Sequence, residues 1–263
     1  MTQLDPISAL NAECDDLDRM VSDLSEQQWN ADTPAPGWTV AHQIAHLAAT
    51  FKMAGLAAAD PDAFVAVVSN LSSNFNANVT HALGEYLNDS HELLLSRWQD
   101  ERAKAVKSLA AVPADQVVPW LVNPLPPAIL AMAGMMEAFA HGQDIADALG
   151  VQRERTDRIK YLVAFAVRTW DFGYQARDEQ PPKVEFHFEL RAPSGAIWEF
   201  GPTDASQRIT GSAVDFCLLT TRRRHREDLD IVAVGVDAEH WVDIAQCYRG
   251  PAGDGRTPGQ FSG

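Results

Sequence analysis

The chain has 263 residues, of which 46% are hydrophobic and 22% are charged, a composition typical of a folded globular protein rather than a disordered one. Its 21 Lys and Arg against 36 Asp and Glu give a formal net charge of −15, which argues against binding to the phosphate backbone of nucleic acids. The three cysteines, Cys14, Cys217 and Cys247, form no CxxC pair, which argues against a disulfide framework and is typical of a reducing compartment.

The N-terminal segment is acidic and lacks the basic and apolar regions of a signal peptide. The most apolar stretch, residues 126–140, is interrupted by Glu137 and is too short to span a bilayer. We therefore expect a cytoplasmic protein with no membrane partner, as a monomer or a homodimer.

Helical periodicity dominates the first half of the sequence. Apolar residues recur at three- and four-residue steps from Ile7 to Leu24, after a helix entry at Asp5-Pro6. A polar connector with two prolines then leads to a helix that opens at Thr39 and closes near Asp60. Further helical stretches are predicted over residues 61–81, where a break is left open, and over 83–110, 128–149 and 153–175. The first domain is thus predicted as a helix bundle over residues 1–177.

The periodicity changes after residues 178–182. Residues 184–190 and 196–201 alternate between apolar and polar and are separated by a turn, which predicts a β-hairpin. The remaining predicted elements are a strand at 207–212, a helix at 213–224, a strand at 229–235 and a helix at 238–248. The predicted fold class is α + (α+β), in which the bundle is followed by a small α+β module over residues 183–250 and a mobile tail over 251–263.

The segment MEAFAHGQDIADALG places Glu137 and His141 four residues apart, so that both project from one face of a helix. A carboxylate and an imidazole at this spacing can bind one metal ion, and Asp144 follows three residues later on the same face. A Glu–His hydrogen bond without a metal, or a half-exposed polar stripe, remains the alternative.

The segment GWTVAHQIAHLA places His42 and His46 four residues apart on the helix that opens at Thr39. Because position 43 is Gln, the segment does not match the HExxH motif of zinc proteases. His46 lies deeper in the apolar run and is the better candidate ligand, whereas a structural role is favoured for His42. If the two helices are neighbours, two imidazoles and a carboxylate form a triad with open positions, which suits Zn²⁺ or non-haem Fe²⁺.

These two segments together resemble the DinB-like metalloproteins, and within them the mycothiol-dependent maleylpyruvate isomerase group of actinobacteria. The resemblance implies that His46, Glu137 and His141 bind a divalent metal, with Zn²⁺ expected and Fe²⁺ or Ni²⁺ as alternatives. It also implies a C-terminal arginine that faces the metal site. Arg222 and Arg223 are the candidates for this catalytic role, and Arg224 is a further one.

The function implied is that of a transferase or isomerase in which a metal-activated thiolate of mycothiol attacks a small electrophilic substrate. A non-catalytic, metal-stabilised module that binds a small molecule is an alternative. Another is a metal-dependent hydrolase with His42 or Asp144 as general base. Cys217 is interpreted as inert packing, and His187 is assigned no role because the inward face of its strand is undetermined.

Overall fold

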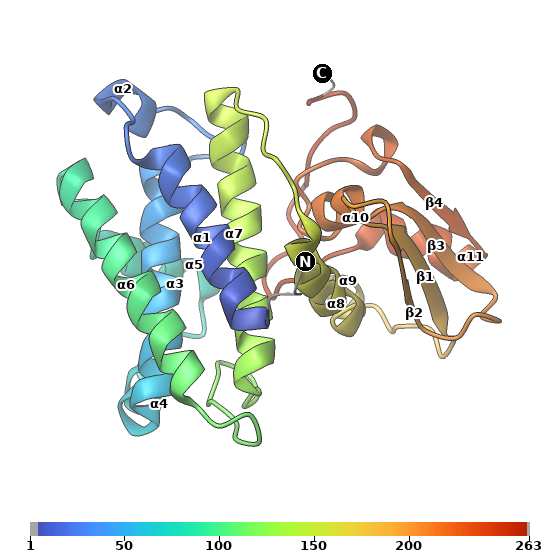
Figure 1. The fold of residues 1–263 in the computed structure, drawn as a ribbon, viewed down its shortest axis with the longest axis horizontal. Helices are drawn as coiled ribbons and strands as arrows, with labels where there is room; N and C mark the ends of the chain where they lie inside the picture. Colours follow the sequence, from blue (N-terminus) through green and yellow to red (C-terminus); the bar gives the residue numbers. More distant parts are fainter. Residues whose placement is uncertain (1–4, 262–263) are drawn as a thin grey trace. The chain divides into compact units, whose positions relative to one another are not determined.

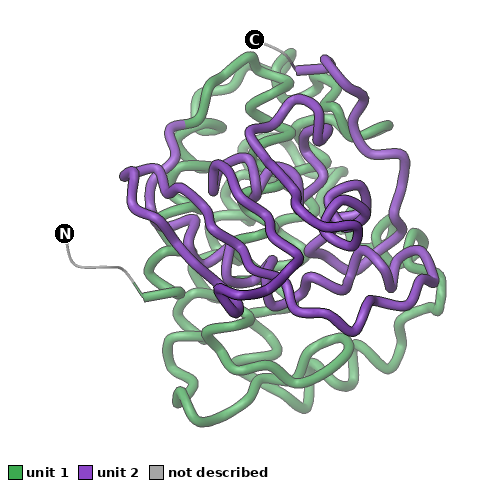
Figure 2. The backbone as a smooth tube through the Cα atoms, turned by 90° about the vertical axis from the view of Figure 1, so that its right-hand side faces the viewer, with its two compact units in different colours: residues 1–153 green, residues 154–263 purple. Residues whose placement is uncertain are grey.

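A computed structural model describes residues 5–261. The chain divides into two compact units, Met1–Arg153 and Glu154–Gly263, which Figure 2 shows in different colours. Among the described helices, none combines the length and the apolar composition needed to cross a membrane.

The first unit is a helix bundle, as predicted. Four long helices pack against one another, and three short ones, α2, α4 and α5, lie in the connections (Figure 1). Their bounds are α1 Pro6–Val21, α2 Glu26–Trp29, α3 Val40–Ala59, α4 Pro61–Val68, α5 Phe75–Gly84, α6 His91–Ala111 and α7 Pro127–Leu149. The stretch 61–81 is indeed broken, and the helix expected from residue 83 begins only at His91.

Local signals in the sequence fix the ends of these helices. Asp5 caps α1 by accepting hydrogen bonds from the backbone N–H groups of Ile7 and Ser8, with Pro6 in the first turn. Thr39 begins α3 as part of a capping box with His42. Gly150 ends α7 in the left-handed conformation, with φ at 65°, which glycine adopts without steric cost.

The helices α3 and α6 approach each other closely at Gly55. A Cβ atom at this position would lie 3.3 Å from the backbone of Ala105, so a larger residue would force the two helices apart. Large apolar side chains fill the rest of the bundle core, among them Leu10, Leu17, Ile44, Leu47, Phe51, Trp98 and Phe139.

A buried ion pair joins α1 to the segment after α7. Arg153 Nη2 lies 2.7 Å from Glu13 Oε1, and neither side chain is more than 7% exposed. The guanidinium also donates to the carbonyl oxygen of Phe139 and lies against Gly142, where a Cβ atom would collide with it. The glycine inside α7 therefore makes room for the arginine that neutralises Glu13.

The second unit is the α+β module. It begins with a short 3₁₀ turn at Asp157–Ile159 and the helices α8 Lys160–Arg168 and α9 Phe172–Gln175. The strands are β1 Phe186–Arg191, β2 Ile197–Phe200, β3 Gln207–Ser212 and β4 Ile231–Val234, and the helices α10 Ala213–Thr220 and α11 Val236–Ile244 accompany them. The predicted hairpin is therefore confirmed, as are the third and fourth strands.

The four strands form one sheet in the order β2-β1-β3-β4. β1 pairs antiparallel with β2 and parallel with β3, and β3 pairs antiparallel with β4. Phe186 and Phe188 of β1 project from one face and pack on Trp241 of α11, and Phe188 also packs on Phe216 of α10. The alternate residues of β1, His187 and Glu189, belong to the opposite face.

The unit boundary differs from the predicted one. We expected a single helix over 153–175 within the bundle and a boundary between 177 and 183, whereas the chain divides after Arg153. The stretch is split into two helices, and the first of them, α8, packs against α10 of the module. In addition, Trp241 Nε1 donates to the carbonyl oxygen of Trp170 at 2.8 Å, so the connection between α8 and α9 is bonded to α11.

Residues of the predicted tail that the structure describes, up to 261, make hydrogen bonds to the module, and the mobility expected over 251–263 stays a prediction. Gly259 N–H donates to the carboxylate of Asp228 at 2.8 Å, and Arg222 Nη2 donates to the carbonyl oxygen of Gly253 at 3.2 Å. These bonds hold the tail against the module.

Candidate metal centre

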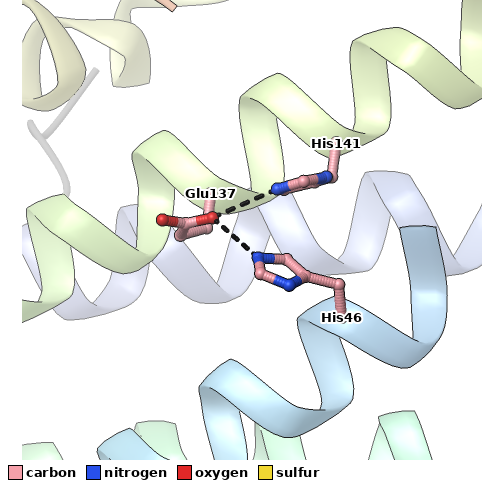
Figure 3. A group of neighbouring side chains, drawn as sticks. All are labelled: His46, Glu137 and His141. Atoms are coloured by element: carbon pink, nitrogen blue, oxygen red, sulfur yellow. Dashed lines mark ion pairs between the residues drawn. The ribbon is translucent and has the colours of Figure 1, made fainter. Parts of the chain in front are cut away.

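The three predicted ligands lie together in the bundle. His46 projects from α3, and Glu137 and His141 project from one face of α7 toward it (Figure 3). Glu137 Oε2 lies 3.5 Å from His46 Nε2 and 3.2 Å from His141 Nε2. One ligand atom from each residue lies within 4.8 Å of the other two, close enough for all three to bind one ion.

A buried amide orients the imidazole of His141. Gln43, which is fully buried on α3, donates from Nε2 to Thr33 Oγ1 at 2.8 Å. Thr33 in turn donates to the carbonyl oxygen of Trp38 at 2.8 Å. The Gln43 oxygen is thereby left to accept from the Nδ1–H group of His141, which fixes the ring with Nε2 directed toward Glu137.

Aromatic rings enclose one side of the cluster. The indole of Trp38 lies 5.3 Å from the ring of His46 and is stacked on that of His141 at 5.9 Å, measured between ring centroids. The side chains of His46, Glu137 and His141 are nevertheless 20%, 23% and 12% exposed. The site is therefore sheltered but remains partly exposed to solvent.

Glu137 is held in its charged form. Burial by itself would raise the pKa of this carboxyl group, but the hydrogen bonds and positive charge of His141 and His46 lower it well below its usual range. An ionised carboxylate between two imidazoles is the state in which these groups accept a metal ion.

His42 and Asp144, the other polar residues singled out in these two helices, are not members of the cluster. His42 Nδ1 lies 2.8 Å from Thr39 Oγ1 and accepts from the backbone N–H of Thr39 at 3.3 Å. The ring of His42 therefore belongs to the cap of α3. Asp144 is fully buried, one turn beyond His141. The structural role favoured for His42 agrees with these contacts.

Gln43 was not predicted as a functional residue, and in the sequence it only breaks the HExxH motif. The signal was a lone amide inside the apolar run of α3, since a buried amide requires hydrogen-bond partners.

The candidate arginines follow α10 in the second unit. Arg222 has a φ of 59°, rare for a residue other than glycine. The backbone N–H of Arg222 donates to the carbonyl oxygen of Leu219, and the backbone N–H of Arg223 donates to the carbonyl oxygen of Leu218. These two hydrogen bonds form a Schellman motif that ends α10. Arg222 also lines a small basic pocket of about 130 Å³ with Arg224, Arg226 and Arg256. A role for Arg222 or Arg223 in catalysis stays a prediction.

The backbone of Arg222 allows a first test. We expect Arg222→Gly to be more stable than Arg222→Ala by about 1 kcal/mol, because alanine retains the steric cost of the left-handed conformation and glycine does not. Urea unfolding of the two variants measures the difference. Equal stabilities would show that this turn carries no strain.

The comparisons with known proteins agree with the fold. The model of the mycothiol maleylpyruvate isomerase N-terminal domain family matches residues 10–146, and a second model, described as wyosine base formation, matches residues 182–234. The uncharacterized proteins MT0041 and Rv0036c of Mycobacterium tuberculosis are each 43% identical over 250 residues, which cover 95% of this chain and 97% of theirs.

Two crystal structures of the mycothiol-dependent maleylpyruvate isomerase, one of them of a point variant, superpose with TM-scores of 0.54 and 0.58. Their sequence identities to this chain are 14% and 13%, over 87% of this chain and 91% of theirs, so they show a shared fold. Since the family model covers more than half of the chain, including all three predicted ligands, the protein belongs to the mycothiol maleylpyruvate isomerase N-terminal domain family, with a DinB-like bundle.

Proposed function

We propose that this protein is a divalent-metal-dependent transferase or isomerase that uses mycothiol as its thiol and acts on a small electrophilic substrate. The observation that carries the proposal is the convergence of His46, Glu137 and His141, with the imidazole of His141 already oriented by Gln43. The choice of mycothiol rests on the family and on the name of the structural relatives.

The donor set fits a metal. Two imidazole nitrogens and one carboxylate oxygen suit Zn²⁺, and Fe²⁺ and Ni²⁺ accept the same ligands. Three protein ligands leave coordination positions open, which is typical of catalytic sites rather than structural ones. When bound, such a metal lowers the pKa of a thiol and so supplies a thiolate near neutral pH.

The residues of the chain prepare the site. Gln43 holds the proton of His141 on Nδ1, and Glu137 stays ionised between the two rings. Trp38 shields one side from water, and the exposed edge of the cluster admits the thiol and the substrate. The three cysteines are buried, so the nucleophilic sulfur comes from a separate small molecule.

The proposed reaction begins with attack of the thiolate on carbon. In an isomerisation the C–S bond forms as the electron pair of a conjugated double bond moves to a neighbouring carbonyl group. After rotation about the new single bond, the pair returns and the C–S bond breaks. In a transfer the C–S bond forms as the leaving group departs with its electron pair. Arg222 or Arg223 would pair with an acidic group of the thiol or the substrate.

Metal analysis combined with calorimetry tests the proposal. Purified wild-type protein is compared with His46→Ala and Glu137→Ala, and each is titrated with mycothiol. About one metal per chain at this site, lost in both variants, together with thiol binding that requires the metal, supports the proposal. Retention of this metal equivalent by both variants contradicts it, and metal-dependent folding without thiol binding favours a non-catalytic binding module.

The role of Gln43 gives a second, finer test. We expect Gln43→Leu to lower the affinity for Zn²⁺ by about 10–100-fold without removing any ligand, because His141 loses the acceptor that fixes its proton. A competition titration against a chelating dye measures the affinity, and thermal unfolding checks that the bundle is intact. Unchanged affinity in a folded variant would show that Gln43 does not orient His141.

A further inference from the structure

A second group of side chains of the kinds that bind metals lies in the module. It belongs to β1 and β2, whose strands are labelled in Figure 1. His187 and Glu189 are two residues apart on β1, so they share the face of the sheet opposite to Phe186 and Phe188. Glu199 of β2 is paired directly with Glu189. Strand register thus places the Glu199 carboxylate beside an imidazole and a carboxylate that lie ten or more positions earlier in the sequence.

The ligand atoms of these three residues lie within 4.8 Å of one another. His187 is completely buried, whereas the side chains of Glu189 and Glu199 are 44% and 55% exposed. An ion held by them would therefore meet a protein nitrogen on the inner side and water on the outer side.

The imidazole of His187 is oriented as a ligand. Its Nδ1 donates to the carbonyl oxygen of Gly201 at 3.3 Å, which leaves the lone pair on Nε2. Gly201 has a φ of 80°, and a Cβ atom there would collide with the carbonyl oxygen of Phe186. Only glycine therefore allows this close approach, and a carbonyl that fixes the ring is a common outer contact of metal-binding histidines.

Among the residues that the structure describes, none is a hydrogen-bond partner of His187 Nε2. Its nearest carboxylate oxygen, Glu199 Oε1, lies 3.7 Å away, too far for a hydrogen bond. A buried nitrogen without a partner costs free energy, and here it faces the two carboxylates.

The charges of this cluster favour a cation. Glu189 and Glu199 stand opposite each other on neighbouring strands, an arrangement that is destabilising for like charges. Arg208 offsets part of this charge, with Nη2 at 3.8 Å from Glu189, but its Nη1 donates to the carbonyl oxygen of Thr203 at 2.8 Å. A cation among His187, Glu189 and Glu199 would satisfy the lone nitrogen and relieve the repulsion.

We propose that His187, Glu189 and Glu199 form a second divalent-cation site, separate from the one in the bundle. One imidazole nitrogen and two carboxylate oxygens, completed by water, are a ligand set for Zn²⁺ or Mn²⁺. Its role is structural, because the ligands join the edge strand β2 to β1. The proposal does not depend on the function of His46, Glu137 and His141.

Zn²⁺ stoichiometry tests this site. The full chain is stripped of metal with a chelator and titrated with Zn²⁺ by calorimetry, beside Glu199→Gln, Glu189→Gln and His187→Gln. We expect Glu199→Gln and Glu189→Gln, which change exposed groups, to bind one equivalent fewer than wild type or to bind it at least tenfold more weakly. The difference from wild type is informative whether or not the site in the bundle binds Zn²⁺.

Glu179→Gln is the matched control. Glu179 pairs with His240 at 2.6 Å in the same module but, within residues 5–261, belongs to no group of three candidate ligands, so its removal should leave the stoichiometry unchanged. The proposal is overturned if Glu199→Gln and Glu189→Gln bind as many equivalents as wild type with the same affinity. It is also overturned if Glu179→Gln loses the same equivalent, since the loss would then be unspecific.

Discussion

His141→Ala is expected to lose the metal of the bundle and, with it, thiol-dependent turnover. His141 supplies one of three ligand atoms, and its Nε2 faces Glu137 at 3.2 Å. Loss of a residue that only hydrogen-bonds to a metal ligand typically lowers metal affinity by about 10–100-fold. Loss of a ligand itself should therefore lower the affinity by more than about 100-fold. Metal analysis after gel filtration and turnover assays with saturating mycothiol measure the two effects.

His42→Ala is the control for this prediction. His42 lies on the same helix as His46 but caps α3, so its loss should cost about 1 kcal/mol of stability and leave metal content unchanged. A metal-free His141→Ala protein with full activity would contradict the proposed mechanism. Equal metal loss in both variants would point to unfolding rather than to loss of a ligand.

Arg153→Leu is expected to lower the free energy of unfolding of the first unit by about 3–5 kcal/mol, because Glu13 would remain as a buried charge without its arginine partner. This loss is a large fraction of the roughly 5–15 kcal/mol that stabilises an ordinary domain. Urea unfolding followed by circular dichroism at 222 nm measures it.

Two comparisons sharpen this second prediction. Lys52→Ala breaks an exposed ion pair with Glu85 in the same bundle and should cost less than about 1 kcal/mol. Adding Glu13→Gln to Arg153→Leu removes the unpaired buried charge of Glu13 and should recover part of the lost free energy of unfolding. If Arg153→Leu costs no more than Lys52→Ala, the pair does not stabilise the bundle.

Much of the fold could be predicted because its signals are local. The helix period, Pro6 after Asp5 and Gly150 after α7 gave the bundle helices, and two-residue alternation gave the hairpin. The boundary between the units could not be predicted in this way. An apolar stripe on α8 fits a bundle and a module equally well, and only the packing against α10 decides between them.

The grouping of His46, Glu137 and His141 could be predicted from spacing and resemblance, since Glu137 and His141 share a helix face and His46 lies in a recognisable turn, whereas their role as metal ligands stays a prediction. The environment of these ligands was not predictable. Gln43 reaches His141 across 98 residues of sequence, and its partner Thr33 lies in a loop without regular structure. Likewise, Glu199 joins His187 only through the register of β1 and β2.

The position of Gly142 has a consequence for the dynamics of the bundle. It follows His141 directly and lies against Arg153, which anchors Glu13 of α1. A fluctuation that separates α1 from α7 must therefore break the ion pair next to the turn that bears two of the predicted ligands. We expect a metal bound by Glu137 and His141 to stabilise this part of α7, and so to slow backbone amide exchange in α1, although α1 provides none of the three predicted ligands.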